Sequence, residues 1–138
     1  MIGMPNSKLL TIAVPAYNAA SYLHTCLDSL VQSGDEVEVL VVNDGSKDGT
    51  LQVARDYAER YPGIVVAVDQ ENRNWGGAVN HALELASGTF FYIVDSDDWL
   101  DSAKLTEVVS RLRMLEEQQA GVDLYMVNYV YNRVENGD

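Results

Sequence analysis

The sequence predicts an α/β fold of three layers (α/β/α), in which helices cover both faces of a mostly parallel, Rossmann-like sheet. Apolar runs of strand length alternate with segments whose apolar residues recur at helical spacing, in the order βαβαβαβαβ. Each unit takes roughly 20 to 30 residues, which is typical of parallel strands joined by crossover helices. With 138 residues, the chain has the length of one domain with a core of its own.

The first strand is expected at Leu9–Val14, a short apolar run that Pro15 ends. A helix should follow and end near Gly34, because apolar residues recur there at the spacing of one buried face. These residues are Leu23, Cys26, Leu27, Leu30 and Val31. The second strand should span Val37–Val42 and lead into residues 43–49, a stretch rich in turn-forming residues.

The second helix should end at Pro62–Gly63, and either Ser46 or Asp48 is expected to cap its N-terminus. Its inner face consists of Leu51, Ala54, Tyr57, Ala58 and Tyr61. The third strand is expected at Ile64–Val68, where all residues are small or branched. A polar loop should then run from Asp69 to Gly77.

A third helix, with Gly88 as its stop, should precede a fourth strand at Phe90–Val94. The helix face consists of Ala78, Val79, Ala82, Leu83 and Ala86. Five apolar or aromatic residues in a row suit a strand that is covered on both faces. A last helix should run from about Asp101 to Gly121, before a strand-like segment at Val122–Tyr131. Its inner residues are Leu105, Val108, Val109, Leu112 and Leu115.

Composition narrows the classes of partner. Nine basic and 21 acidic side chains give a net charge of −12, which disfavours nucleic acid and anionic lipid surfaces. The single cysteine, Cys26, lies on a predicted helix face and is expected to be a buried thiol in a reducing compartment. We expect neither a signal peptide nor a transmembrane segment, and therefore a cytoplasmic location. Peripheral membrane contact of a longer protein and assembly into a homo-oligomer stay open.

Three carboxylates, those of Asp95, Asp97 and Asp98, directly follow the fourth strand. Because side chains alternate along an extended segment, the first two should point to the same side. Carboxylate oxygens are the ligands that hard divalent cations prefer. A plain turn and helix cap is the competing explanation. An EF-hand is excluded, because Leu100 and Thr106 stand where that loop requires glycine and glutamate.

Seven segments follow one another in an order and spacing that resembles the nucleotide-sugar-binding half of a family 2 glycosyltransferase of the GT-A fold. They are residues 11–18 (TIAVPAYN), 22–23 (YL), 26–30 (CLDSL), 41–50 (VVNDGSKDGT), 71–72 (EN), 76–80 (GGAVN) and 94–100 (VDSDDWL). The resemblance implies metal-dependent, inverting transfer from a nucleotide-diphospho-sugar, expected to be a UDP-sugar, to an acceptor hydroxyl. It also implies Mg²⁺ or Mn²⁺ as cofactor and a saccharide or lipid-linked acceptor.

The same resemblance implies roles for individual residues. Asp97 and Asp95 would bind the metal, Asp95 would also face the nucleotide, and Asp44 would accept a hydrogen bond from uracil, as a carboxylate can from an imide N–H. The remaining nucleotide-binding positions would be Pro15, Ala16, Tyr17, Asn18, Asn80 and Ser96. For Tyr17, stacking on the base and an ordinary place in the wall stay equally open. For Asp44, a plain strand-to-helix turn is the competing explanation.

A sheet ordered 3-2-1-4 would bring these strand ends together, because its order reverses between the first and fourth strands. One segment departs from the family pattern: Val79 stands where many members carry arginine, which leaves Arg73 as the nearest cation for a phosphate. Trp75 and Trp99 are expected either to line a sugar site or to pack. His24 and His81 are expected to be surface or hydrogen-bonded residues.

The catalytic base has no assigned residue, since family members carry it in an acceptor-side segment after the acidic strand end. Residues 1–138 are therefore interpreted as a single donor-binding domain that is truncated at its C-terminus and inactive or weakly active alone. Two alternatives stay open at this point. One is a non-catalytic nucleotide-binding or scaffolding module. The other is a phospho-receiver, disfavoured because Pro15–Asn18 stands where its acidic pair would lie.

Overall fold

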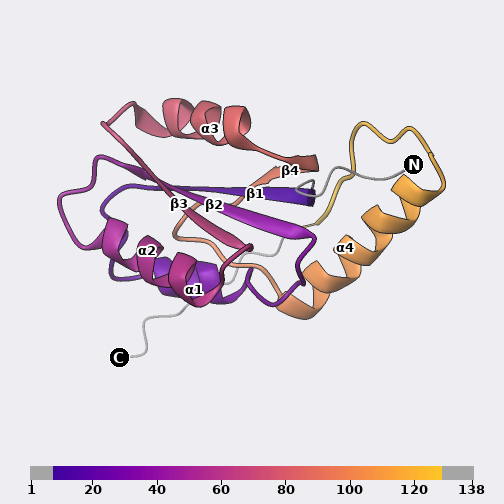
Figure 1. Ribbon diagram of the computed structural model, residues 1–138, viewed down its shortest axis with the longest axis horizontal. Helices are drawn as coiled ribbons and strands as arrows, with labels where there is room; N and C mark the ends of the chain where they lie inside the picture. The colour runs from indigo at the N-terminus through magenta and orange to yellow at the C-terminus, as the bar shows by residue number, and fades with distance from the viewer. Residues whose placement is uncertain (1–7, 129–138) are drawn as a thin grey trace.

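The computed structural model describes residues 8–128, in which four strands and four helices alternate along the chain (Figure 1). The strands are β1 (Lys8–Ala16), β2 (Val37–Asp44), β3 (Val65–Gln70) and β4 (Gly88–Ile93). The helices are α1 (Leu23–Asp28), α2 (Thr50–Arg60), α3 (Asn74–Leu85) and α4 (Ser102–Glu117). None of these helices combines the length and apolar composition needed to cross a membrane.

The strands form one sheet in the order β3-β2-β1-β4, and each neighbouring pair is parallel. β1 therefore lies between β2 and β4, with Val14 opposite Val41 and Ala13 opposite Ile93. This confirms the predicted order. The chain reverses its direction of travel across the sheet between β1 and β4, and at such a point the loops at the carboxyl ends of the strands leave a crevice for ligands.

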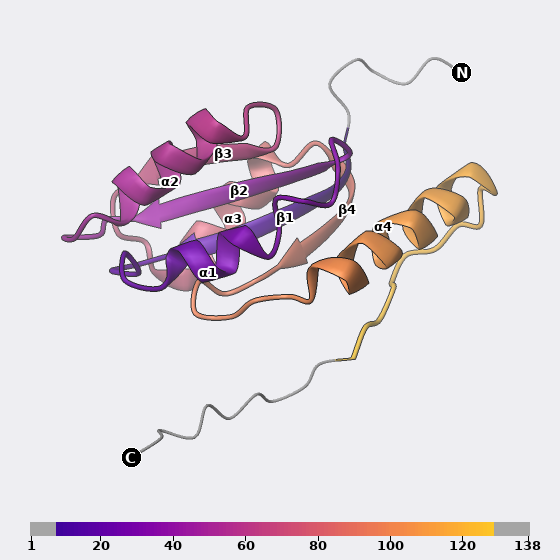
Figure 2. The same ribbon diagram turned by 90° about the horizontal axis from the view of Figure 1, so that it is seen from below.

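Helices cover both faces of the sheet, as the three-layer prediction requires. Helices α1, α2 and α4 lie on one face and α3 lies on the other (Figures 1 and 2). The larger core joins β1 and β2 to the three helices, and Leu27, Ala54 and Val109 are among its buried members. The smaller core packs Ala78 and Ala82 of α3 against the opposite face.

Burial separates the central strands from the outer ones. Every residue of β2 is buried, as is β1 from Leu10 onward. By contrast, β4 is half-buried or exposed throughout, and the Tyr92 side chain is 40% exposed. The prediction that the Phe90 run is covered on both faces is therefore wrong for residues 8–128. The reason is its position at the outside of the described sheet, which leaves part of each side chain in solvent.

Two predicted boundaries in the middle of the chain are also corrected. β3 continues through Asp69 and Gln70, which pair with Asn43 and Asp44, and α3 begins at Asn74. The expected loop over 69–77 is thus reduced to residues 71–73. On the third predicted helix, Ala78 and Ala82 are the buried residues, whereas Leu83 is 55% exposed.

The predicted last strand over 122–131 is not found in its described part, since residues 122–128 form no strand. Val122 is only half-buried, and the side chains from Leu124 to Val127 are exposed. An apolar run alone cannot form a strand without a partner that supplies the ladder hydrogen bonds. Residues 129–131 lie outside the described residues.

A buried polar network closes the amino-terminal end of the sheet. Glu38 of β2 is 9% exposed, and its Oε1 accepts hydrogen bonds from Thr11 Oγ1 at 2.5 Å and from Ser87 N at 2.6 Å. Thr11 Oγ1 in turn accepts from Gly88 N at 2.8 Å. Gly88 was predicted to end α3, but it is the first residue of β4 and is held against β1 by this network.

Replacement of Gly88 by alanine is expected to destabilise the protein. The added Cβ would lie 2.4 Å from Thr11 N and 2.8 Å from the carbonyl carbon of Leu10, both backbone atoms that cannot rotate away. Such overpacking costs about 1–3 kcal/mol, measurable as a lower urea midpoint. Gly76→Ala is the matched control, because its Cβ would meet nothing within 4 Å and alanine favours the helix. Equal midpoints for the two variants would contradict the steric account.

Candidate functional site

Two loops at the carboxyl end of the sheet are tied together by hydrogen bonds. Asn18 N donates to Ser46 Oγ at 2.9 Å, and Lys47 N donates to Asn18 Oδ1 at 2.8 Å. Ala19 N donates to the buried Thr50 Oγ1 at 2.8 Å. Asn18 adopts a φ of 48°, which asparagine tolerates better than most residues. Its side chain therefore fixes the loop after β2 against the loop after β1.

Asp44 ends β2 and is the hub of the neighbouring contacts. Its carboxylate is almost fully buried, and Oδ1 accepts from Gln70 Nε2 at 2.9 Å and from Arg73 N at 2.6 Å. The next residue, Gly45, has a φ of +71°, and a Cβ there would lie 2.8 Å from Asn72 N. Only glycine permits both this conformation and this approach. The segment 71–73 can therefore pack directly against the end of β2.

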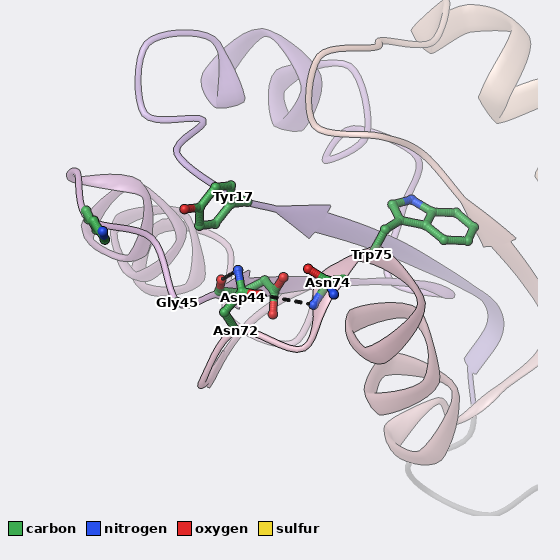
Figure 3. Close-up of a pocket in the computed structure, with 7 residues that line it drawn as sticks. Tyr17, Asp44, Gly45, Asn72, Asn74 and Trp75 are labelled. Atoms are coloured by element: carbon green, nitrogen blue, oxygen red, sulfur yellow. Dashed lines mark hydrogen bonds between the residues drawn. The ribbon is translucent and has the colours of Figure 1, made fainter.

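These contacts form the floor of an open pocket of about 450 Å³. It is lined by Tyr17, Asp44, Gly45, Lys47, Asn72, Asn74 and Trp75. In Figure 3, the Tyr17 ring lies above Asp44 and Asn72, and Trp75 lies to their right at the start of α3. Tyr17 is 47% exposed and Trp75 is 55% exposed, so both rings are accessible to a ligand. An aromatic ring beside a buried carboxylate suits a flat, hydrogen-bonding ligand.

A cluster of three carboxylates follows β4. One oxygen each of Asp95, Asp97 and Asp98 can be chosen so that all lie within 4.8 Å of one another. Partial burial raises the pKa of Asp98, and the negative charges of Asp97 and Asp95 raise it further. Between residues 8 and 128, no lysine or arginine forms a salt bridge with the cluster. An all-oxygen set with uncompensated charge fits a hard divalent cation such as Mg²⁺ or Mn²⁺.

Trp75 joins the pocket to the carboxylate cluster. Its ring lines the pocket, and its Nε1 donates a hydrogen bond to Asp95 Oδ1 at 2.8 Å. Cys26 Sγ approaches the backbone carbonyl oxygen of the same Asp95 at 3.7 Å. Burial, with the charges of the three aspartates, raises the pKa of the Cys26 thiol to about 12. The thiol is therefore neutral. Its burial confirms the prediction of a buried cysteine.

The remaining residues predicted to bind nucleotide fall into two groups. Pro15 and Ala16 are the buried last residues of β1, and Ser96 is half-buried beside the carboxylates. Asn80 differs, because it is exposed on α3 and is not among the residues that line the pocket. The structure thus brings Tyr17, Asp44 and the aspartates to one end of the sheet. It does not bring the Asn80 side chain into the described pocket wall.

Sequence reasoning missed or left open four residues of this region. Lys47 lines the pocket and places a positively charged side chain there. Arg73, in contrast, contributes a backbone N–H to Asp44. Gln70 lies outside every segment of the family resemblance, and Asn72 belongs to it only as part of the segment 71–72. The signal for Lys47 and Asn72 was their place in loops after strands, since such loops meet at one edge of a parallel sheet. No local pattern marks Gln70, because its partner Asp44 comes from another strand.

Comparison with known proteins decides the family. The model of glycosyl transferase family 2 matches residues 11–137. The chain belongs to this family. EpsH from Bacillus subtilis (strain 168), a protein named as a glycosyltransferase, is 33% identical over 129 residues, which are 93% of this chain and 36% of EpsH. The chain therefore spans about a third of the length of this relative.

Solved structures agree with the family and the fold. Residues 1–349 of S. aureus TarS in complex with UDP-GlcNAc align with a TM-score of 0.68 and 30% identity, over 80% of this chain and 32% of that one. The mannosyltransferase PcManGT from Pyrobaculum calidifontis, in complex with GDP-Man and Mn²⁺, gives 0.63 and 31%, over 75% and 32%. The predicted family and GT-A fold are thus confirmed, and the phospho-receiver alternative loses its basis.

Proposed function

We propose that this chain is the donor-binding part of an inverting glycosyltransferase that binds a UDP-sugar together with Mg²⁺ or Mn²⁺. The observation that carries the proposal is the junction at Trp75, which places a base-sized pocket floored by Asp44 next to the cluster of Asp95, Asp97 and Asp98. A nucleoside diphosphate has two parts that match this arrangement. Its flat base would enter the pocket, and its charged diphosphate would meet a cation held by the cluster. The structures of TarS in complex with UDP-GlcNAc and of PcManGT in complex with GDP-Man and Mn²⁺ support a nucleotide-sugar as the ligand.

Each part of the donor has residues suited to hold it. The Asp44 carboxylate would accept the imide N–H of uracil, while Tyr17 would contact the face of the ring, a type of contact worth about 1–3 kcal/mol per base. Lys47 lies in the same pocket and would attract the negative diphosphate. Asp97 and Asp95 would hold the divalent cation, with Asp98 close enough to contribute a third oxygen. When bound, that cation supplies neutralisation of charge on the diphosphate leaving group.

Sugar transfer is also a proposal, because the chain spans only 36% of the length of EpsH and 32% of the TarS chain. An acceptor hydroxyl would attack the anomeric carbon while a general base takes its proton. No residue between 8 and 128 is assigned as that base. We propose that residues 1–138 form one donor-binding domain and that the base and the saccharide or lipid-linked acceptor site belong to a separate region of the protein.

Calorimetry with UDP tests the proposal. Titration of UDP into the chain with Mn²⁺ present is expected to show saturable binding, which weakens when EDTA replaces the metal. The reason is that the diphosphate then faces three uncompensated carboxylates. ADP serves as the ligand control, since its base lacks an imide N–H. Absence of UDP binding with Mn²⁺ would refute donor binding, and affinity unchanged by EDTA would refute the metal requirement.

A further inference from the structure

A chain of three polar side chains runs beneath the pocket. The Nδ1 atom of His81 lies 2.7 Å from Gln70 Oε1, and Gln70 Nε2 lies 2.9 Å from Asp44 Oδ1. His81 belongs to α3, while Gln70 and Asp44 are the last residues of β3 and β2 and stand opposite each other in the ladder. Three separate elements therefore converge on one carboxylate, although only Asp44 lines the pocket.

The chemistry of the groups fixes the direction of both hydrogen bonds. A carboxylate can only accept, so the amide nitrogen of Gln70 must face Asp44. The amide oxygen then faces His81, and Nδ1 of the histidine must carry a proton to donate to it. His81 thereby locks the orientation of the Gln70 amide, and Gln70 in turn holds the carboxylate.

The two oxygens of Asp44 are left in different states. Oδ1 accepts two hydrogen bonds, from Gln70 Nε2 and from Arg73 N at 2.6 Å, which uses both of its lone pairs. No residue between 8 and 128 donates to Oδ2. The carboxylate is only 4% exposed, so it has little freedom to turn its other edge to a ligand. Asp44 therefore offers the pocket a single acceptor atom.

We propose that Gln70 and His81 are positioning residues that occupy Asp44 Oδ1 and so make the pocket select uracil over guanine. Uracil presents one imide N–H, which one free oxygen can satisfy. Guanine presents an N–H and an amino group side by side, and its full recognition by a carboxylate needs both oxygens. With one oxygen filled, guanine leaves a donor unpaired in the pocket, which lowers its affinity. This inference rests on the proposed function and goes beyond it by naming what excludes the wrong base.

The test is the ratio of GDP to UDP dissociation constants, measured by calorimetry with Mn²⁺. Gln70→Met keeps the length of the side chain but removes the donor to Oδ1. The ratio is expected to fall about tenfold, which is the effect of one charge-assisted hydrogen bond. Guanine would gain Oδ1 as a second acceptor, whereas uracil would face a carboxylate that Gln70 no longer holds in place. His81→Ala should lower the ratio less, since Gln70 remains in place. Only variants that still melt cooperatively are compared. A general loss of stability would weaken GDP and UDP alike and so leave the ratio of their dissociation constants unchanged.

Matched controls separate this inference from the proposed function. Gln52→Met changes an exposed glutamine on α2 whose amide bonds Asp56, and His24→Ala changes an exposed histidine on α1; neither should alter the ratio. Failure of the unchanged protein to bind UDP would overturn the proposed function. Binding of UDP with an unaltered ratio in Gln70→Met would overturn the inference alone. If Gln70→Met does not fold, an unaltered ratio in His81→Ala overturns it instead.

Discussion

Replacement of Asp97 by asparagine is expected to lower the affinity for UDP in Mn²⁺ by at least 10- to 100-fold, and to leave little difference between Mn²⁺ and EDTA. Mutation of a residue that only hydrogen-bonds to a metal ligand lowers metal affinity by this factor. Loss of a residue that binds the metal directly should lower it at least as much. The change removes one charge from three carboxylates that lie within 4.8 Å of one another. The measurement is a calorimetric titration of UDP with each metal condition.

Asp101→Asn is the matched control for the charge. Asp101 lies just beyond the cluster and caps α4, where its side chain accepts from Lys104 N at 3.1 Å. Asparagine caps a helix as well as aspartate does, so the fold should be kept while the net charge changes by the same amount. Equal losses of UDP affinity in both variants would show that general charge, rather than the metal site, controls binding.

Replacement of Asp44 by asparagine is expected to weaken UDP about 10- to 100-fold while CDP binding is kept or improved. The asparagine Oδ1 can keep the hydrogen bonds from Gln70 and Arg73, so that Nδ2 takes the place of Oδ2. A donor would then meet the imide N–H of uracil, and the loss of a charge-assisted hydrogen bond costs about 1.5–3 kcal/mol. Cytosine presents an acceptor at the same ring position, which Nδ2 satisfies.

Asp69→Asn controls for charge at the same edge of the sheet. Asp69 is exposed on β3, where its carboxylate accepts from Asn43 Nδ2 at 3.0 Å, and it does not line the pocket. Its replacement should leave the UDP and CDP affinities unchanged. If Asp44→Asn binds UDP as the unchanged protein does, the base does not lie against Asp44.

The sequence was sufficient for the order and direction of the strands. β1 and β2 are mostly apolar because both their faces are buried, and such stretches are recognisable in the sequence despite Thr11 and Glu38. The strand order then places the ends of β1, β2 and β4 at one edge, which is why Tyr17, Asp44 and Asp95 could be grouped in advance. The family resemblance added their expected roles.

The sequence was insufficient where a contact joins elements that are distant in the chain. Nothing local marks Trp75 as the donor to Asp95 or Gln70 as the donor to Asp44, because each contact depends on how two elements pack. Asn80 is grouped with the nucleotide by motif alone; it is exposed on α3 and does not line the described pocket, so its role stays a prediction. The segment 122–128 shows the same limit, because an apolar run becomes a strand only when a neighbour pairs with it.

A crystal structure of the chain with UDP and Mn²⁺ tests the central claim most directly, with data collected at a wavelength where manganese scatters anomalously. The predicted result is uracil beside Tyr17 with its imide N–H on Asp44 Oδ2, and an anomalous peak bonded to Asp97. Nucleotide bound away from Asp44, or manganese bound away from the cluster of Asp95, Asp97 and Asp98, would contradict the account.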